Sequence, residues 1–128
     1  MAGERVLVVE DNEKSMKLFR DVLRATGHDT LEAGSGEHAV ELALAYRPAL
    51  VLMDMQLPGI DGVEALSRLR GDERTAAIPV LALTAQAMEG DRERFLEAGF
   101  DGYVEKPISV RAFPDQVRRF LPDEVATE

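Results

Sequence analysis

The chain has no cysteine among its 128 residues, which excludes a disulfide framework, a thiolate metal site and a cysteine nucleophile. It is also short of positive charge, because 15 Lys and Arg face 24 Asp and Glu and leave a formal net charge of −9 at pH 7. Non-specific binding to nucleic acid or to an anionic membrane depends on clustered Lys and Arg. We therefore expect neither nucleic acid nor membrane as a partner.

Long hydrophobic runs are absent as well. The apolar run at residues 6–9 ends at Glu10 and is too short for the core of a signal peptide, and no run approaches the length of a membrane span. A chain that is 45% apolar and 30% charged is typical of a globular protein. We expect a cytoplasmic protein with one domain over residues 1–128, a core at about 4–122 and a short C-terminal tail at 123–128.

Short apolar runs alternate with segments whose apolar residues recur at helical spacing. The runs indicate buried strands at about 6–9, 28–32, 50–53, 79–83 and 102–104. The segments between and after them predict helices at about 13–26, 39–44, 62–69, 90–98 and 109–121. Asp61 is the predicted cap of the third helix, whose apolar face would carry Val63, Leu66 and Leu69. These repeated strand-then-helix units predict an α/β fold with a parallel sheet covered by helices on both faces.

Chemically active side chains stand where the predicted strands end. They are Glu10 and Asp11 after the first strand, Asp54 after the third, Thr84 after the fourth and Lys106 after the fifth. The carboxyl ends of parallel strands lie along one edge of a sheet, so these side chains are expected to be neighbours. The sequence thus places three carboxylates, a hydroxyl and an ammonium group at one site.

Crowded carboxylates repel one another, and a divalent cation relieves that repulsion. Oxygen ligands without cysteine or clustered histidine favour Mg²⁺, with Mn²⁺ as the alternative ion. Lys106 can meet a phosphoryl oxygen as a point charge, and Thr84 can donate a hydrogen bond to it. The carboxylate of Asp54 can itself attack phosphorus to form an aspartyl-phosphate.

Several motifs, in this order, make the sequence resemble bacterial response-regulator receiver domains over about residues 4–122. They are VVEDN at 8–12, LMDMQLPGIDG at 52–62, LTA at 83–85 and Lys106-Pro107. Within the family, the likeness is greatest to the DivK-like receivers that stand alone without an output domain. The resemblance implies a flavodoxin-like (CheY-like), doubly wound five-stranded parallel sheet with strand order 2-1-3-4-5 and five helices. It also implies a bacterial cytoplasmic protein of a two-component phosphorelay.

The resemblance implies that Asp54 accepts a phosphoryl group from a histidine kinase or a histidine phosphotransfer protein. Asp11 and Asp54 would bind Mg²⁺ directly together with the backbone carbonyl of Gln56, and Glu10 would act through water. Position 10 is Glu where many receivers have Asp, and its longer side chain changes the reach to the water shell of the ion. The protein would be a phosphoacceptor rather than an enzyme acting on an external metabolite.

Further roles follow from the same resemblance. Thr84 and Lys106 would contact the phosphoryl oxygens, and Tyr103 would move inward as Thr84 shifts, so that a downstream protein target recognises the phosphorylated monomer or weak dimer. A separate hypothesis is that Gln56 and Gln86 set the phosphoryl lifetime by steering water, with the small Ala85 leaving access open. The Lys106-Pro107 bond would be cis.

An apolar patch is expected to receive the kinase or the phosphotransfer protein. Met16 and Leu18 lie beyond the obvious apolar face of the first helix, and Pro107 and Ile108 follow the fifth strand. Together these residues can form an exposed apolar surface for a partner helix.

Other interpretations of the same residues stay open. Glu10 or Asp11 could simply cap the first helix, Thr84 could be an ordinary strand residue, and Tyr103 a half-buried aromatic. A phosphatase of the haloacid-dehalogenase type also forms an aspartyl-phosphate, but it needs a second aspartate where this chain has Gln56. A flavodoxin-like cofactor carrier needs a phosphate-binding loop after the first strand, where Glu10 and Asp11 would repel phosphate. The chain could also be a receiver module excised from a larger hybrid kinase or regulator.

Overall fold

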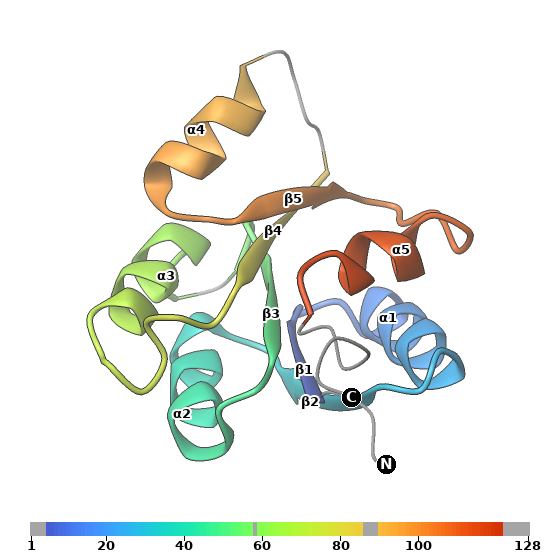
Figure 1. The fold of residues 1–128 in the computed structure, drawn as a ribbon, viewed down its shortest axis with the longest axis horizontal. Helices are drawn as coiled ribbons and strands as arrows, with labels where there is room; N and C mark the ends of the chain where they lie inside the picture. Colours follow the sequence, from blue (N-terminus) through green and yellow to red (C-terminus); the bar gives the residue numbers. More distant parts are fainter. Residues whose placement is uncertain (1–4, 58, 86–89, 122–128) are drawn as a thin grey trace, which may run out of the picture.

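The computed structural model describes residues 5–57, 59–85 and 90–121, and in these ranges strands and helices alternate along the chain (Figure 1). The strands are β1 (Arg5–Val9), β2 (Asp29–Ala33), β3 (Leu50–Asp54), β4 (Val80–Thr84) and β5 (Gly102–Glu105). The helices are α1 (Glu13–Ala25), α2 (Gly36–Tyr46), α3 (Gly62–Arg70), α4 (Asp91–Ala98) and α5 (Phe113–Arg118). All strand pairs are parallel and the sheet order is β2-β1-β3-β4-β5, which confirms the predicted fold.

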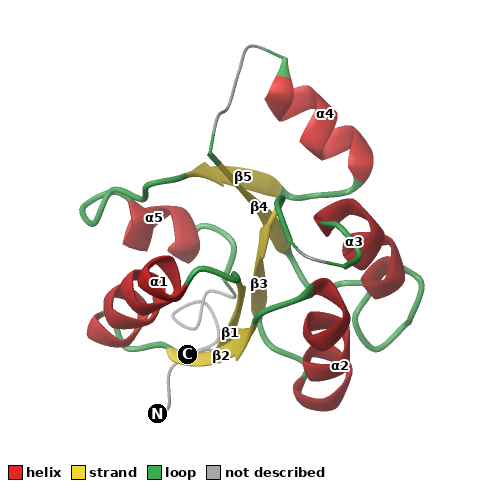
Figure 2. Ribbon diagram, turned by 180° about the vertical axis from the view of Figure 1, so that it is seen from behind, coloured by secondary structure: helices red, strands yellow, loops and turns green. Residues whose placement is uncertain are grey.

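Helices cover both faces of the sheet, with α1 and α5 on one face and α2, α3 and α4 on the other (Figures 1 and 2). The central strands β3 and β4 are buried along their whole length, which explains their unbroken apolar runs. Side chains that alternate along the strands feed two separate cores. On the α1 and α5 side the rings of Phe19 and Phe113 pack at 5.5 Å between centroids, and on the other side Leu66 and Phe100 are buried.

Polar side chains fix the beginnings of two helices beside the carboxyl edge of the sheet. Asn12 caps α1, since its side-chain oxygen accepts hydrogen bonds from the backbone N–H groups of Lys14 and Ser15. Asp61 caps α3, as predicted, by accepting a hydrogen bond of 2.8 Å from the backbone N–H of Glu64. The caps make both helices start directly after the loops that carry the polar strand ends.

Two local predictions were wrong. The last helix was predicted over 109–121, but α5 is confined to Phe113–Arg118. Ser109 instead closes a separate turn, in which its side chain accepts a hydrogen bond from the backbone N–H of Ala112, and the chain after Arg118 tightens into three-residue turns. Val63 was predicted on the apolar face of α3, yet it is exposed, because Ala65, Leu66 and Leu69 already fill that face.

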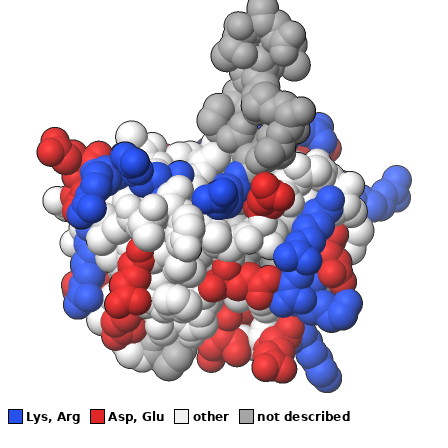
Figure 3. Space-filling view, turned by 90° about the horizontal axis from the view of Figure 1, so that it is seen from below, with Lys and Arg blue, Asp and Glu red and all other residues white. Residues whose placement is uncertain are grey.

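The surface carries charges of both signs. Figure 3 shows acidic and basic side chains interspersed across the face seen from below. Within the described residues, no helix combines the length and the apolar character that crossing a bilayer requires. The tail expected at 123–128 and Gln86 lie outside the described residues.

Candidate functional site

The ends of the parallel strands bring the predicted site residues together at one edge of the sheet. The ammonium Nζ of Lys106, which follows β5, donates hydrogen bonds of 2.9 Å to Glu10 Oε1 and 2.8 Å to Asp54 Oδ2. The backbone N–H of Lys106 donates to the backbone carbonyl of Thr84 at 2.7 Å. One lysine therefore links the ends of β1, β3 and β4, and the peptide bond that follows it, Lys106–Pro107, is cis.

The Asp54 carboxylate is held at both of its oxygens. It is 2% exposed, and its Oδ1 accepts a hydrogen bond of 2.9 Å from the backbone N–H of Gln56 while its Oδ2 meets Lys106. Because β3 ends at this residue, its backbone position is set by the parallel pairing with β4. Asp54 is therefore a buried but well-oriented carboxylate, a state that suits attack on an incoming group.

Glu10 and Asp11 complete an acidic cluster around Asp54. Glu10 is buried, and its Oε2 accepts a hydrogen bond of 3.1 Å from the backbone N–H of Asn12, whereas Asp11 is exposed. One carboxylate oxygen from each of the three residues lies within 4.8 Å of the others. Neither Glu10 nor Asp11 caps α1, since Asn12 does so, and the capping interpretation of the two acids is wrong. A donor set of close carboxylate oxygens fits a hard divalent cation.

The electrostatics of the cluster follow from burial and from the shared lysine. Burial raises the pKa of Glu10, and the hydrogen bonds from Lys106 and from the Asn12 N–H oppose this only in part. Burial alone would lower the pKa of Lys106, but its hydrogen bonds to Asp54 and Glu10 raise it above the usual value. Lys106 therefore stays charged at neutral pH, and it faces more carboxylates than it can neutralise.

Thr84 and Tyr103, the two residues predicted to move on phosphorylation, lie on neighbouring strands. Thr84 is the last residue of β4 and is 9% exposed. Tyr103 lies in β5, opposite Ala82 in the register, and its half-buried ring packs against Phe95 of α4 at 5.7 Å between centroids. Tyr103 also lines a small cavity of about 330 Å³ between β5 and α5. The positions match the prediction, and the movement of these side chains stays a prediction.

The predicted docking patch needs a correction. Leu18 and Pro107 are exposed, but Met16 and Ile108 are 7% and 8% exposed and belong to the core between the sheet and α1 and α5. Met16 precedes Phe19 by three residues on the buried face of α1, so the helical period turns it inward. Of the four residues predicted to form the patch, only Leu18 and Pro107 are exposed.

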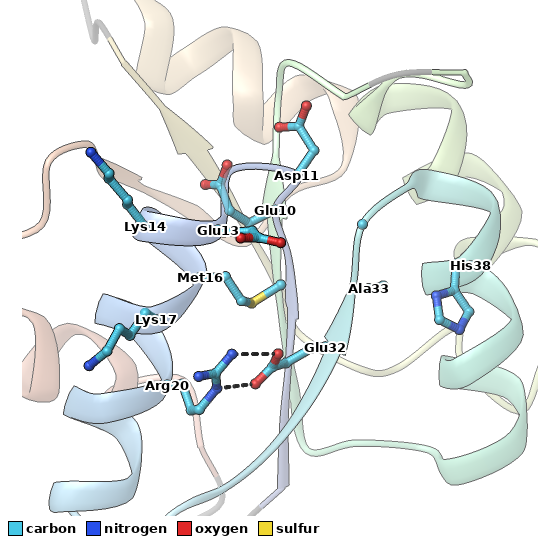
Figure 4. Close-up of a pocket in the computed structure, with 11 residues that line it drawn as sticks. Glu10, Asp11, Glu13, Lys14, Met16, Lys17, Arg20, Glu32, Ala33 and His38 are labelled. Atoms are coloured by element: carbon cyan, nitrogen blue, oxygen red, sulfur yellow. Dashed lines mark hydrogen bonds and ion pairs between the residues drawn. The ribbon is translucent and has the colours of Figure 1, made fainter.

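A groove that the sequence did not predict leads away from the acidic cluster. It has a volume of about 690 Å³ and runs between α1 and β2, with Glu10 and Asp11 at one end (Figure 4). Further along, Arg20 of α1 forms a bidentate ion pair with Glu32 of β2, in which the Nη2–Oε1 distance is 2.9 Å. Arg20 lowers the pKa of Glu32 through this pair. The two residues lie on separate elements, so no local sequence pattern marked them as partners.

Comparison with known proteins agrees with this geometry. The family model of the response regulator receiver domain matches residues 6–118. The polar-differentiation response regulator DivK of Brucella ovis is 47% identical over 118 residues, which cover 92% of this chain and 96% of the relative. The chain also matches ShkA, solved at full length in complex with AMPPNP, with 37% identity and a TM-score of 0.81 over 92% of this chain and 24% of that one.

Solved receiver domains have the same fold. The receiver domain of the sensor histidine kinase PA1611 from Pseudomonas aeruginosa, which holds a magnesium ion in its active site cleft, matches with a TM-score of 0.85 and 35% identity over 93% of this chain and 98% of that one. The chemotaxis protein CheY4 of Vibrio cholerae matches with a TM-score of 0.87 and 22% identity over 94% of this chain and all of that one, which supports the fold alone. Family match, identity and fold agree, and the chain belongs to the response regulator receiver domains, where it is DivK-like.

Proposed function

We propose that this receiver domain acts as a phosphoacceptor in a two-component phosphorelay. Asp54 would receive the phosphoryl group of a phosphohistidine on a histidine kinase or a histidine phosphotransfer protein. The observation that carries the proposal is the buried Asp54 carboxylate, which shares Lys106 with Glu10 at the carboxyl edge of the sheet. The bacterial relatives support a place in the bacterial cytoplasm.

The transfer makes one bond and breaks one. A carboxylate oxygen of Asp54 forms a bond to phosphorus while the bond between phosphorus and the donor nitrogen breaks, and the electron pair stays on the imidazole. Catalysis of phosphoryl transfer consists mainly of positioning and charge neutralisation. The backbone N–H of Gln56 orients the acceptor, and the Lys106 ammonium stands next to it to meet the negative charge of the incoming group.

The acidic cluster fits a divalent cation. Asp11, Asp54 and the backbone carbonyl of Gln56 would hold Mg²⁺ directly, with Glu10 acting through water, and Mn²⁺ is the alternative ion. When bound, the ion neutralises charge on the phosphoryl oxygens. The magnesium ion in the PA1611 receiver domain and the oxygen-only donor set of Glu10, Asp11 and Asp54 support this assignment.

Phosphorylation would switch the protein through charge. The new group adds about −1.5 to −2 units and new acceptor oxygens, which would draw Lys106 and Thr84 toward position 54. Movement of Thr84 would make room for Tyr103 to turn inward. A downstream protein target that binds the altered surface better by about 1 to 3 kcal/mol would shift the population, with the receiver as a monomer or weak dimer.

The proposed function does not include turnover of an external metabolite. A phosphatase with an aspartyl-phosphate intermediate needs an acid close to the nucleophile to protonate the leaving group. Position 56 carries an amide instead, and its backbone N–H already binds Asp54 Oδ1. Gln56 cannot supply that proton.

Intact-mass measurement after incubation with a small-molecule phosphodonor and Mg²⁺ tests the proposal. The wild type is expected to gain one phosphoryl group, and Asp54→Asn to gain none. Asp29→Asn makes the same chemical change at an exposed position in β2 and serves as the matched control, which should be labelled like the wild type. An unlabelled wild type, or equal labelling of Asp54→Asn, would refute the assignment.

A further inference from the structure

In the loop between β3 and α3 the structure describes residues 55–57 and 59–61, which connect the proposed acceptor to the next helix. At its start, the backbone N–H of Gln56 binds Asp54 Oδ1 at 2.9 Å, and at its end Asp61 caps α3. The backbone carbonyl of Gln56 is also one of the groups assigned to the cation. The shape of this loop therefore decides where two main-chain groups of the site lie.

The beginning of α2 holds the α3 end of this loop by a polar contact. Glu37 Oε2 accepts a hydrogen bond of 3.3 Å from the backbone N–H of Ile60. Both carboxylate oxygens of Glu37 also lie directly against Gly59, since a Cβ atom at Gly59 would be 2.8 Å from each of them. Gly59 has a φ of +76°, so the loop turns sharply at the point where the carboxylate meets it.

An apolar contact lies beside the polar one. A Cβ atom at Gly36 would lie 2.7 Å from Ile60 Cγ1 and 3.0 Å from the Ile60 carbonyl oxygen, so Ile60 packs straight onto the backbone of Gly36. Gly36 and Glu37 are the first two residues of α2. One helix start thus contacts the loop through both its backbone and its carboxylate.

From this geometry we propose that Glu37 is a positioning residue for the phosphorylation site. Its hydrogen bond is with the Ile60 N–H rather than with the acidic cluster, and through Ile60 it acts on the backbone groups of Gln56. The inference rests on the proposed function, because it assigns Glu37 a part in holding the cation and the acceptor in place. Loss of the carboxylate would let the loop fluctuate and would weaken cation binding without unfolding the domain.

Three variants separate the hydrogen bond from the charge. Glu37→Ala removes both, and Glu37→Gln keeps an oxygen that accepts from Ile60 but removes the charge. Glu41→Ala removes a negative charge from an exposed position one turn further along the same helix. Mg²⁺ binding to the unphosphorylated protein is measured by calorimetry, and exchange of the Ile60 amide hydrogen is measured by NMR without Mg²⁺.

Glu37→Ala is expected to weaken Mg²⁺ binding by about three- to tenfold, less than the ten- to hundredfold typical of a residue that holds a metal ligand directly. Its Ile60 amide should exchange faster than in the wild type, because the acceptor is gone. Glu37→Gln and Glu41→Ala should both stay within about twofold of the wild-type affinity, since charges near a surface act weakly at a distance.

Two outcomes would overturn the inference while leaving the proposed function intact. One is wild-type Mg²⁺ affinity and Ile60 exchange in Glu37→Ala. The other is equal weakening in Glu37→Gln and Glu37→Ala, which would assign the effect to charge. Failure of the wild type to bind Mg²⁺ would refute the assigned cation site and the role of Glu37 with it.

Discussion

The two edges of the sheet each hold a cation among oxygen atoms, but the partners are of different kinds. At the carboxyl edge, the Lys106 ammonium binds the side-chain carboxylates of Glu10 and Asp54. At the amino edge, the Arg70 guanidinium donates mainly to backbone carbonyls. Its partners are the carbonyl oxygens of Ala76 at 3.1 Å, Ile78 at 2.6 Å and Gly99 at 3.0 Å, and Asp101 Oδ2 at 2.9 Å.

The difference indicates a structural role for Arg70 and a role in the chemistry of the site for Lys106. Backbone carbonyls neither titrate near neutral pH nor move without the chain, so Arg70 fixes the end of α3 to the beginnings of β4 and β5. Carboxylates can bind a proton or another cation in place of the lysine. The stability that the Lys106 ion pairs contribute therefore depends on pH and on the concentration of divalent ions. We therefore expect the Arg70 contacts to respond to mutation alone and the Lys106 contacts to respond to mutation, Mg²⁺ and pH together.

Arg70→Met should have the largest effect on stability. It leaves several partly buried carbonyls without a donor and should cost about 3 kcal/mol of unfolding free energy. Urea denaturation with and without Mg²⁺ measures the loss, which should be the same in both. Arg68→Met, which removes only an exposed pair with Glu64, is the control and should stay within about 0.5 kcal/mol of the wild type. A loss that Mg²⁺ relieves would contradict the structural role.

Lys106→Met should destabilise the protein by about 2 kcal/mol without divalent ions, because it leaves two buried carboxylates without their cation. Mg²⁺ should restore most of this loss, since the ion replaces the missing charge. The same denaturation experiment with increasing Mg²⁺ measures the recovery. Equal losses with and without Mg²⁺ would show that Lys106 acts at this edge as Arg70 acts at the other.

An Asp→Asn change should cost stability at one edge and not at the other. Asp101 Oδ2 accepts hydrogen bonds from both Arg70 and the backbone N–H of Val80, so Asp101→Asn should cost about 1.5 kcal/mol. Asp54→Asn removes one of three crowded carboxylates and leaves Lys106 paired with Glu10, so its stability should stay within about 0.5 kcal/mol of the wild type. Thermal unfolding of both variants measures the two losses of stability. A larger loss for Asp54→Asn than for Asp101→Asn would contradict the expected difference between the edges.

The smallest expected effects concern pH, and they have opposite signs at the two edges. Burial raises the pKa of Glu10, so its contribution favours folding below its ordinary pKa of 4.5 and is lost as pH rises through the raised value. Burial and the nearby Arg118 lower the pKa of His28, which precedes β2, so stability falls as pH drops below its ordinary 6.5.

Denaturation series in pH test both directions. Glu10→Gln should remove the loss of stability on raising pH, and His28→Gln should remove the loss between neutral pH and the lowered pKa of His28. Unchanged pH profiles in both variants would mean that neither group titrates with folding.

The fold was predictable because its signals are local and repeated. The apolar runs before Glu10, Asp54 and Thr84 indicate buried parallel strands, and the ends of such strands share an edge whatever their separation in sequence. Side-chain direction within a helix was less predictable. Met16 was predicted to be exposed because it lies before the apolar face that Phe19, Val22 and Leu23 form on α1. Helical geometry places Met16 on that same face.

Contacts between separate elements gave no sequence signal. Arg70 meets residues up to 31 positions away, and Glu37 meets Ile60 across 23. Each is an ordinary charged residue on a helix, and only the folded chain shows that its partners are backbone groups of a distant loop. The site residues were found because their chemical types are unusual at strand ends, a criterion that these two residues do not meet.

The span of the Lys106 hydrogen bonds has a consequence for how the protein becomes active. They reach partners 96 and 52 positions earlier in the chain, and the lysine itself comes after the last strand. A polypeptide still emerging from the ribosome, or a proteolytic fragment that ends before β5, has Asp54 but lacks its counter-charge. On the proposed function, competence to accept a phosphoryl group would therefore arrive only with the completed domain.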